Sequence, residues 1–288
     1  MTSQQFFIWD AYRRLLSKVV LGCLYLCLLA LGAACEAEIP TPPPVITPTN
    51  PPVTLQIGLT GSAAEIAALA AEPFEAEYPY TAVQFITANN RTLLADLAAG
   101  QLDAVLVHTL PATTEHWFNP VALDGLVIIV HPDNPVTGLS TAEIQAIFNG
   151  QITNWTSLGG ADLPIEVISR EQGAGSRSLF SERIMLEQRV TITAQIVSDN
   201  NQMIETVAAN PAAVGYSMMG IVSAKVRPVA VEGITATPDT TADQSYPLTT
   251  PLYFVSPAEP TGSLRLFLSW LQSDDGQIVI GEKYGRVR

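Results

Sequence analysis

The stretch Arg170-Glu-Gln-Gly-Ala-Gly-Ser-Arg-Ser-Leu-Phe180 follows an apolar, strand-like run at residues 165–169 and leads into a helix-like run at residues 179–187. It predicts a strand, a charged residue, a glycine turn and a helix start, in that order. The first N–H groups of a helix have no partner within it, and the helix dipole adds partial positive charge there. With glycines, a serine hydroxyl and two arginines, such a turn suits an oxyanion such as phosphate. An ordinary strand–helix turn with surface arginines has the same pattern, so these residues alone do not decide between the two.

From Val53 onward the chain alternates short apolar strands with helices, which indicates an α/β fold. Helices are expected after residues 60–62, where the helix reaches toward Pro73, and from residues 89–91. Another is expected to begin at Ser140, which forms a capping box with Glu143, and Leu139 and Ile144 are placed for a hydrophobic staple. Strands are expected at residues 53–59, 83–86, 103–107, 125–130, 165–169, 194–198, 213–217 and 251–255.

The N-terminal segment has the features of an export signal. Basic residues precede an apolar run at residues 19–34, which is too short to span a membrane and long enough for a signal peptide. Gly32-Ala-Ala-Cys35 is similar to a lipoprotein cleavage box, although Leu31 stands four residues before the cysteine instead of three. We expect residues 1–35 to be a signal peptide with a lipidated Cys35; a retained signal anchor is the alternative. Residues 36–52, rich in proline and threonine, are expected to form an extended tether.

Composition limits the partners and cofactors. Only 14% of residues are charged and the net charge is −13, so nucleic acid and anionic lipid surfaces are poor partners. An anion would have to be held by local donors in a closed cleft of low dielectric. All three cysteines lie within the first 35 residues, so the folded part has no disulfide and no cysteine for structural zinc. We expect no cofactor and no metal.

Five blocks carry a family resemblance. The opening stretch resembles the R-x-x-G-S-G-T-R-x-x-F signature of phosphate-binding proteins of ABC transporters, in the type II periplasmic binding protein superfamily. The other blocks resemble, in the family's order, its "IF-G-…-W", "NPGAIGY" and "YPLSRPLY" segments and its final helix; they lie at residues 138–160, 208–216, 246–253 and 267–277.

The resemblance implies a two-lobed periplasmic-binding-protein type II fold. In it, mixed sheets flanked by helices are joined by two crossover hinge strands. Lobe 1 is expected at residues 53–130 and 246–288, and lobe 2 at residues 131–245. Ligands of such α/β sheets lie beyond the carboxyl ends of strands, near helix N-termini. Turns from both lobes would then form a hinged clamp.

The resemblance also implies a set of anion-binding residues: Ser62, Ala63, Asn90, His108, Arg170, Ala174, Gly175, Ser176 and Arg177. Arg170 is expected to make two parallel bonds to an oxyanion, with a salt bridge to Glu171 or Glu182 as the alternative. Asn90 stands where relatives have a Gly-Ser-Gly type turn, and Ala174 replaces a serine. Ser62 and Asn90 could instead be simple helix caps, and Arg177 could be an idle surface residue.

His108 bears most on ligand identity. It falls where relatives place Asp or Ser against the anion, and residues 103–108 resemble the "DVVLVHA" run of tungstate-binding relatives. Hydrogen phosphate needs an acceptor for its proton, whereas sulfate, molybdate and tungstate do not. Neutral imidazole accepts one bond and imidazolium only donates. A histidine that ends a strand without touching ligand is the remaining alternative.

We therefore expect an exported, monomeric solute-binding protein on the outer face of the cell membrane. It would capture an oxyanion, with phosphate preferred, for an ABC permease. Tungstate or molybdate binding, or a non-transport anion sensor or scaffold, are the alternatives. We expect no enzyme, because the chain has no G-x-S-x-G, HExxH or other nucleophile–base arrangement in its sequence.

Overall fold

The computed structural model describes residues 52–287. Cys35, the predicted signal segment and all but the last residue of the predicted tether lie outside this range. The described strands are β1 Val53–Leu59, β2 Thr81–Thr87, β3 Ala104–Val107, β4 Trp117–Val130, β5 Gly138–Leu139, β6 Glu166–Arg170, β7 Gln195–Val197, β8 Ala213–Met218, β9 Arg227–Pro228, β10 Ala230–Val231 and β11 Thr249–Ser256. The α-helices are α2 Ala64–Glu77, α3 Asn90–Ala98, α4 Thr141–Phe148, α5 Gly175–Phe180, α6 Asn200–Ala208, α7 Pro238–Ala242, α8 Gly262–Leu271 and α9 Asp274–Ile280. Short helical turns are η1 Gly61–Ala63, η2 Trp155–Leu158, η3 Ser181–Met185 and η4 Met219–Ile221.

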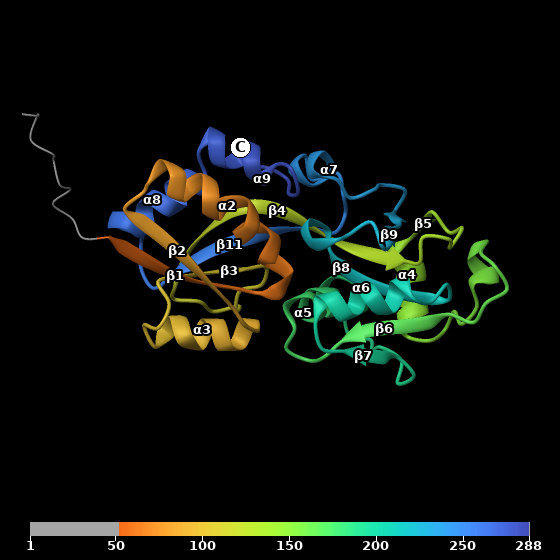
Figure 1. Ribbon diagram of the computed structural model, residues 1–288. Coiled ribbons are helices and arrows are strands. Elements are labelled where there is room, and N and C mark those ends of the chain that lie inside the picture. The colour runs from red at the N-terminus through yellow and green to blue at the C-terminus, as the bar shows by residue number, and fades with distance from the viewer. Residues whose placement is uncertain (1–51, 288) are drawn as a thin grey trace, which may run out of the picture. The chain divides into compact units, whose positions relative to one another are not determined.

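One mixed sheet runs through the whole folded part, in the order β2-β1-β3-β11-β4-β8-β6-β7 (Figure 1). β4 is its longest strand, and its two halves have different neighbours. Residues 117–125 pair antiparallel with β11, and residues 126–130 pair antiparallel with β8. β4 therefore carries the chain directly from one half of the sheet into the other.

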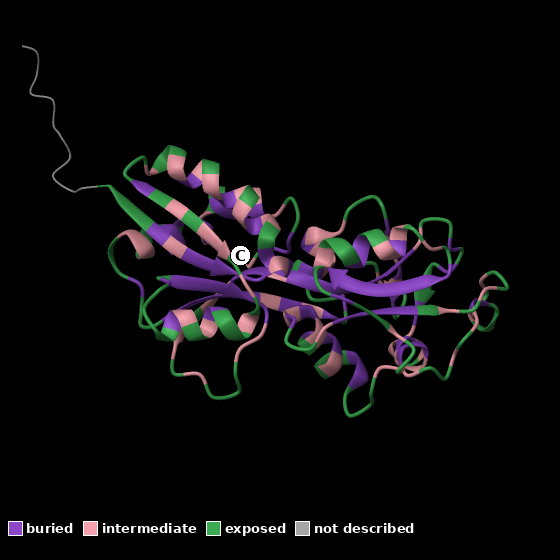
Figure 2. Ribbon diagram, turned by 60° about the horizontal axis from the view of Figure 1, so that its bottom comes forward, coloured by how far each residue is buried: buried purple, intermediate pink, exposed green. Residues whose placement is uncertain are grey.

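Each half of β4 belongs to a different apolar core. One contains Val121 and Ala122 of β4 with β1, α2, α8 and α9, and the other contains Leu126–Val130 with α4, α5, α6 and β8. A smaller cluster lies under α3, because alternate residues of β3 face opposite sides of the sheet. The inner strands are buried and the helices cover them with their outer faces exposed (Figure 2). This arrangement is the expected two-lobed α/β fold.

The exact lobe limits, expected at residues 130 and 246, stay a prediction. Side-chain packing assigns fewer residues to lobe 1 than expected, because Leu126–Val130, Tyr246 and Leu248 belong to the core of lobe 2. The cores divide between Ala122 and Leu126 on β4, and between Leu248 and Leu252 at the start of β11.

Two local predictions fell short. The first half of β4 was not predicted, because Pro120 and Asp124 interrupt its apolar pattern. Pro120 is tolerated because, besides β11, the first half of β4 pairs only at Leu123, with Gly285, so no strand on that side needs a donor from Pro120. The first helix was expected to reach toward Pro73, but α2 continues to Glu77. Phe74, buried against Tyr78, Phe267 and Trp270, holds this last turn in the core.

The predicted capping box at the start of α4 is confirmed. The Ser140 hydroxyl accepts from the Glu143 N–H, and the Glu143 carboxylate accepts from the Ser140 N–H at 2.8 Å. Leu139 and Ile144, the predicted staple, are buried in the same core. Within residues 52–287, no helix combines the length and apolar character needed to cross a membrane.

Replacing Ser140 with alanine should lower the free energy of unfolding by about 1 kcal/mol, because one N–H of the first turn loses its acceptor. Urea unfolding of the two proteins measures this difference. Ser178→Ala, at an exposed serine of α5, is the control and should change stability by less than about 0.5 kcal/mol. An equal loss in both variants would contradict the assignment.

The charge of Glu143 should also make stability depend on pH. The backbone N–H and then the hydroxyl of Ser140 lower the pKa of Glu143 below its ordinary value. A lowered folded-state pKa stabilises the fold above the ordinary pKa, and this contribution is lost as pH falls through the folded-state value. The stability difference between wild type and Glu143→Gln should therefore be constant at neutral pH and shrink in acid. A difference that grows on acidification would contradict this.

Candidate functional site

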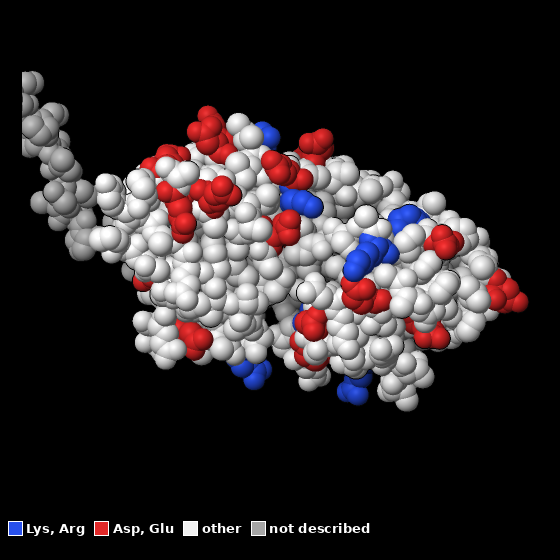
Figure 3. Space-filling model, viewed as in Figure 1, with Lys and Arg blue, Asp and Glu red and all other residues white. Residues whose placement is uncertain are grey.

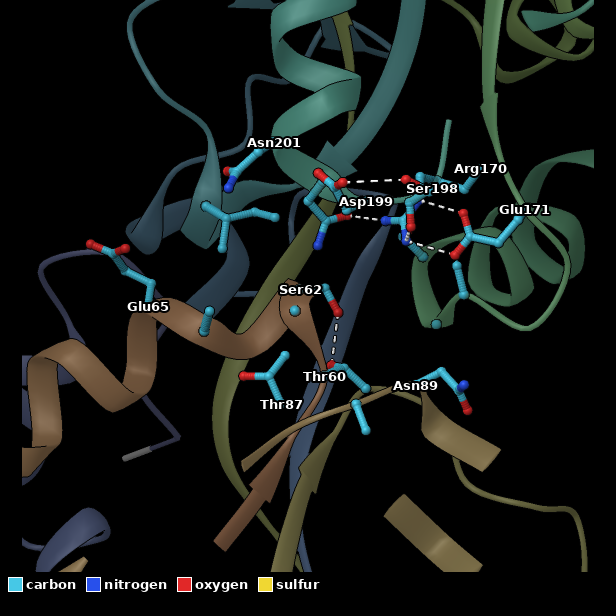
Figure 4. A pocket seen from close by; sticks show the side chains of 18 residues that line it. Thr60, Ser62, Glu65, Thr87, Asn89, Arg170, Glu171, Ser198, Asp199 and Asn201 are labelled. Carbon is cyan, nitrogen blue, oxygen red and sulfur yellow. Dashed lines mark hydrogen bonds and ion pairs between the residues drawn. The ribbon is translucent and has the colours of Figure 1, made fainter. Parts of the chain in front are cut away.

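A cavity of about 610 Å³ lies between the two lobes, at the carboxyl ends of β1 and β6. Lobe 1 lines it with the turn at residues 60–65 and with residues 87–89, and lobe 2 lines it with residues 170–176 and 198–201. Figure 4 shows Thr60 and Ser62 on one side and Arg170, Glu171, Ser198 and Asp199 on the other. Both sides are strand-to-helix turns, and those at residues 60–62, 89–91 and 170–177 were predicted from the sequence.

On the lobe 1 side, a chain of hydrogen bonds leads from the cavity into the protein. The Thr60 and Ser62 hydroxyls lie 2.9 Å apart, and the Ser62 Oγ lies 3.4 Å from His108 Nδ1. His108 Nε2 lies 2.9 Å from Asp124 Oδ2. His108 is buried and so reaches this cavity through Ser62; it also borders a second cavity of about 460 Å³ lined by residues 109–114 and β11.

Asp124 was not among the predicted site residues. It is fully buried, and its Oδ1 accepts from the N–H groups of Gly125 at 2.8 Å and Gly220 at 3.1 Å. Its place was not predicted because the first half of β4 was not. The available signal was an acidic residue immediately before the apolar run 125–130, where a buried carboxylate must have partners.

On the lobe 2 side, Arg170 is 8% exposed and held in place by neighbours. Its Nε and Nη2 donate to the two oxygens of Glu171 at 3.2 and 2.9 Å. Nη2 also donates to the Ser198 carbonyl, and Nη1 to the Asn200 side chain. The Nε–Nη2 edge of Arg170 therefore contacts Glu171. This is the salt bridge given above as the alternative, and contact of Arg170 with an anion stays a prediction.

The glycine turn faces Ser62 across the cavity. A β-carbon placed on Gly175 would lie 3.9 Å from the Ser62 Oγ, so the lobes approach closely here. Ala174 and Ser176 line the cavity, and the Ser176 Oγ is buried without a hydrogen-bond partner among residues 52–287. Because a buried hydroxyl without a partner is unfavourable, this atom is a candidate ligand donor.

Besides His108, three predicted residues lie outside the lining of this cavity. Ala63 is buried behind it. Asn90 donates from Nδ2 to the carbonyl and hydroxyl of Thr109, both at 3.2 Å, while its Oδ1 is buried without a partner in the described part of the chain. The adjacent Asn89 lines the cavity and caps α3. Arg177 donates to the Ser169 hydroxyl, so its guanidinium is directed toward lobe 2.

Lining residues at the start of α6 were missed as well. Asp199 caps this helix, and Asn200 and Asn201 line the cavity. The signal was Ser198-Asp-Asn-Asn201 after a predicted strand, which repeats the strand–turn–helix pattern of the opening stretch.

The lining carries more negative than positive charge. Arg170 is its one cationic side chain, against the carboxylates of Glu65, Glu171 and Asp199. Acidic side chains also gather over α2 and the start of α9 (Figure 3). An anion here would depend on hydroxyl and N–H donors in a closed, low-dielectric cleft.

A PBP superfamily domain matches residues 46–275, and the chain belongs to this superfamily. Among solved structures, it is similar to a putative phosphate ABC transporter substrate-binding protein from Clostridium perfringens, solved with bound phosphate. The two share 27% identity with a TM-score of 0.76, covering 82% of this chain and 100% of that one. An ABC-type phosphate transport receptor from Vibrio cholerae has 29% identity and a TM-score of 0.67, covering 80% and 99%.

Curated relatives include the phosphate-binding protein PstS of Bacillus subtilis, 29% identical over 158 residues, which are 54% of this chain and 52% of the relative. PstS of Pseudomonas aeruginosa is 28% identical over 183 residues, covering 56% and 57%. The chain therefore matches over about half the length of these curated relatives.

Replacing Ser176 with alanine should leave the free energy of unfolding of the ligand-free protein unchanged or slightly higher, because no hydrogen bond is lost. Ser169→Ala is the matched control, since that hydroxyl bonds Tyr216 and Arg177; it should lower stability by about 1–2 kcal/mol. Urea unfolding tests both. A clear loss in Ser176→Ala would mean that its hydroxyl has a structural partner.

Proposed function

We propose that this protein is an extracytoplasmic solute-binding protein that captures phosphate and delivers it to an ABC permease. The observation that carries the proposal is the interlobe cavity, where Ser62 of lobe 1 faces Gly175 and Ser176 of lobe 2. The names of the relatives support the ligand, and the similar Clostridium perfringens structure was solved with phosphate.

The cavity suits a small anion that touches both lobes. Ser62 and Ser176 supply hydroxyls, and the first turns of η1 and α5 supply N–H groups. Arg170, already neutralised by Glu171, adds a donor without a large excess of charge. Binding by dipoles from both lobes would hold the lobes together around the ligand.

We further propose that residues 1–35 export the protein, that Cys35 carries a lipid, and that residues 36–52 tether the folded part to the outer face of the membrane. This rests on the cleavage box and the Pro/Thr-rich stretch in the sequence.

Phosphate should raise the melting temperature of protein stripped of co-purified ligand. A ligand at 100 times its dissociation constant stabilises the fold by about 2.7 kcal/mol. Thermal unfolding should be measured with phosphate, sulfate, molybdate, tungstate and a sugar. Arg170→Ala should remove most of the phosphate shift, whereas Arg265→Ala, at an exposed ion pair with Glu259 in lobe 1, should retain it.

A shift with molybdate or tungstate and none with phosphate would reassign the ligand. No shift with any oxyanion would contradict the proposal and favour a non-transport role.

A further inference from the structure

The hydrogen-bond chain Ser62–His108–Asp124 is buried at every link. Ser62 is 4% exposed, His108 5% and Asp124 0%. Bulk water is therefore a poor substitute for any partner, and the direction of each hydrogen bond is set by the groups themselves.

Asp124 is the fixed end of the chain. Its Oδ1 faces two backbone N–H groups, of Gly125 and Gly220, which can only donate. Two donors directed at one carboxylate oxygen leave the carboxylate as an acceptor for its remaining neighbour. Its Oδ2 is then an acceptor, and the hydrogen between Asp124 and His108 lies on Nε2.

The position of the hydrogen on His108 in turn determines how Ser62 is oriented at the cavity. With its single hydrogen on Nε2, the His108 ring offers a lone pair at Nδ1, so the Ser62 hydroxyl donates to it. The Ser62 oxygen can then only accept from other groups. Thr60 donates to one of its lone pairs, and the other is available to a ligand at the cavity wall.

We propose that Asp124 is a positioning residue that sets the direction of this chain, so that Ser62 presents an acceptor to the cavity and the site selects an oxyanion that still carries a proton. The proposal rests on the proposed function and adds the reason for phosphate. Hydrogen phosphate donates its proton to Ser62, whereas sulfate has no proton to donate and meets a lone pair.

Asp124 also has a structural role, because its bond to Gly220 joins β4 to η4 of lobe 2. Asp124→Asn separates the two roles. The amide oxygen can keep the bonds to Gly125 and Gly220, while the amide nitrogen faces His108 Nε2 and donates to it. The ring hydrogen then moves to Nδ1, which donates to Ser62, and the Ser62 hydroxyl turns toward the cavity as a donor.

The test compares affinities by calorimetry at neutral pH and reads the His108 tautomer by ¹⁵N NMR. In wild type without ligand, we expect the hydrogen on Nε2. In Asp124→Asn, we expect it on Nδ1, and the ratio of phosphate to sulfate affinity should fall about tenfold or more, as for loss of one well-made hydrogen bond in a buried site. Ser62→Ala should lower the same ratio, and adding Asp124→Asn to it should have little further effect.

The outcomes separate the two proposals. If wild type binds no oxyanion, both fail. If wild type binds phosphate but folded Asp124→Asn keeps the wild-type ratio, the inference fails and the proposed function stands. Hydrogen on Nδ1, or on both nitrogens, in wild type also overturns the inference, as does an unchanged ratio in Ser62→Ala, which serves if Asp124→Asn does not fold.

Discussion

The fold depends on one strand that belongs to both lobes. β4 pairs with β11 over its first half and with β8 over its second, so neither core can form its full sheet without it. Asp124 sits where the strand changes partners, and its carboxylate bonds to both sides of this change. The position of the cavity depends on β4 as well. β1 and β6 lie on opposite sides of β4 in the sheet, and the cavity lies at their carboxyl ends.

Local sequence signals predicted much of this arrangement. The alternating strand β1 and the capping box at Ser140 follow from patterns within a few residues, and the opening stretch does form a strand, turn and helix. The strand-to-helix turns that contain Ser62 and Ser176 also follow from local patterns, and their role in binding an anion stays a prediction. Each depends on backbone geometry that neighbouring residues largely determine.

Features set by contacts distant in sequence were missed. Asp124 meets His108 only because β3 and β4 both pair with β11, and this pairing joins residues more than a hundred positions apart. The pairing of Arg170 with Glu171 was given only as an alternative, because sequence spacing alone does not decide which acceptor a guanidinium contacts. The first half of β4 was missed because it contains Pro120. A proline fits in this strand only because no neighbouring strand needs its N–H, and the sequence does not show that.

A strand common to both lobes has a kinetic consequence. The chain joins the two cores at residues 123–126 of β4 and again at residues 248–252, so a change in the angle between the lobes requires both short segments to bend. If both lobes bind the proposed ligand, it can leave only after this bending. Its residence time would then be governed by the stiffness of these short pieces of backbone, so substitutions there would alter release without touching the ligand.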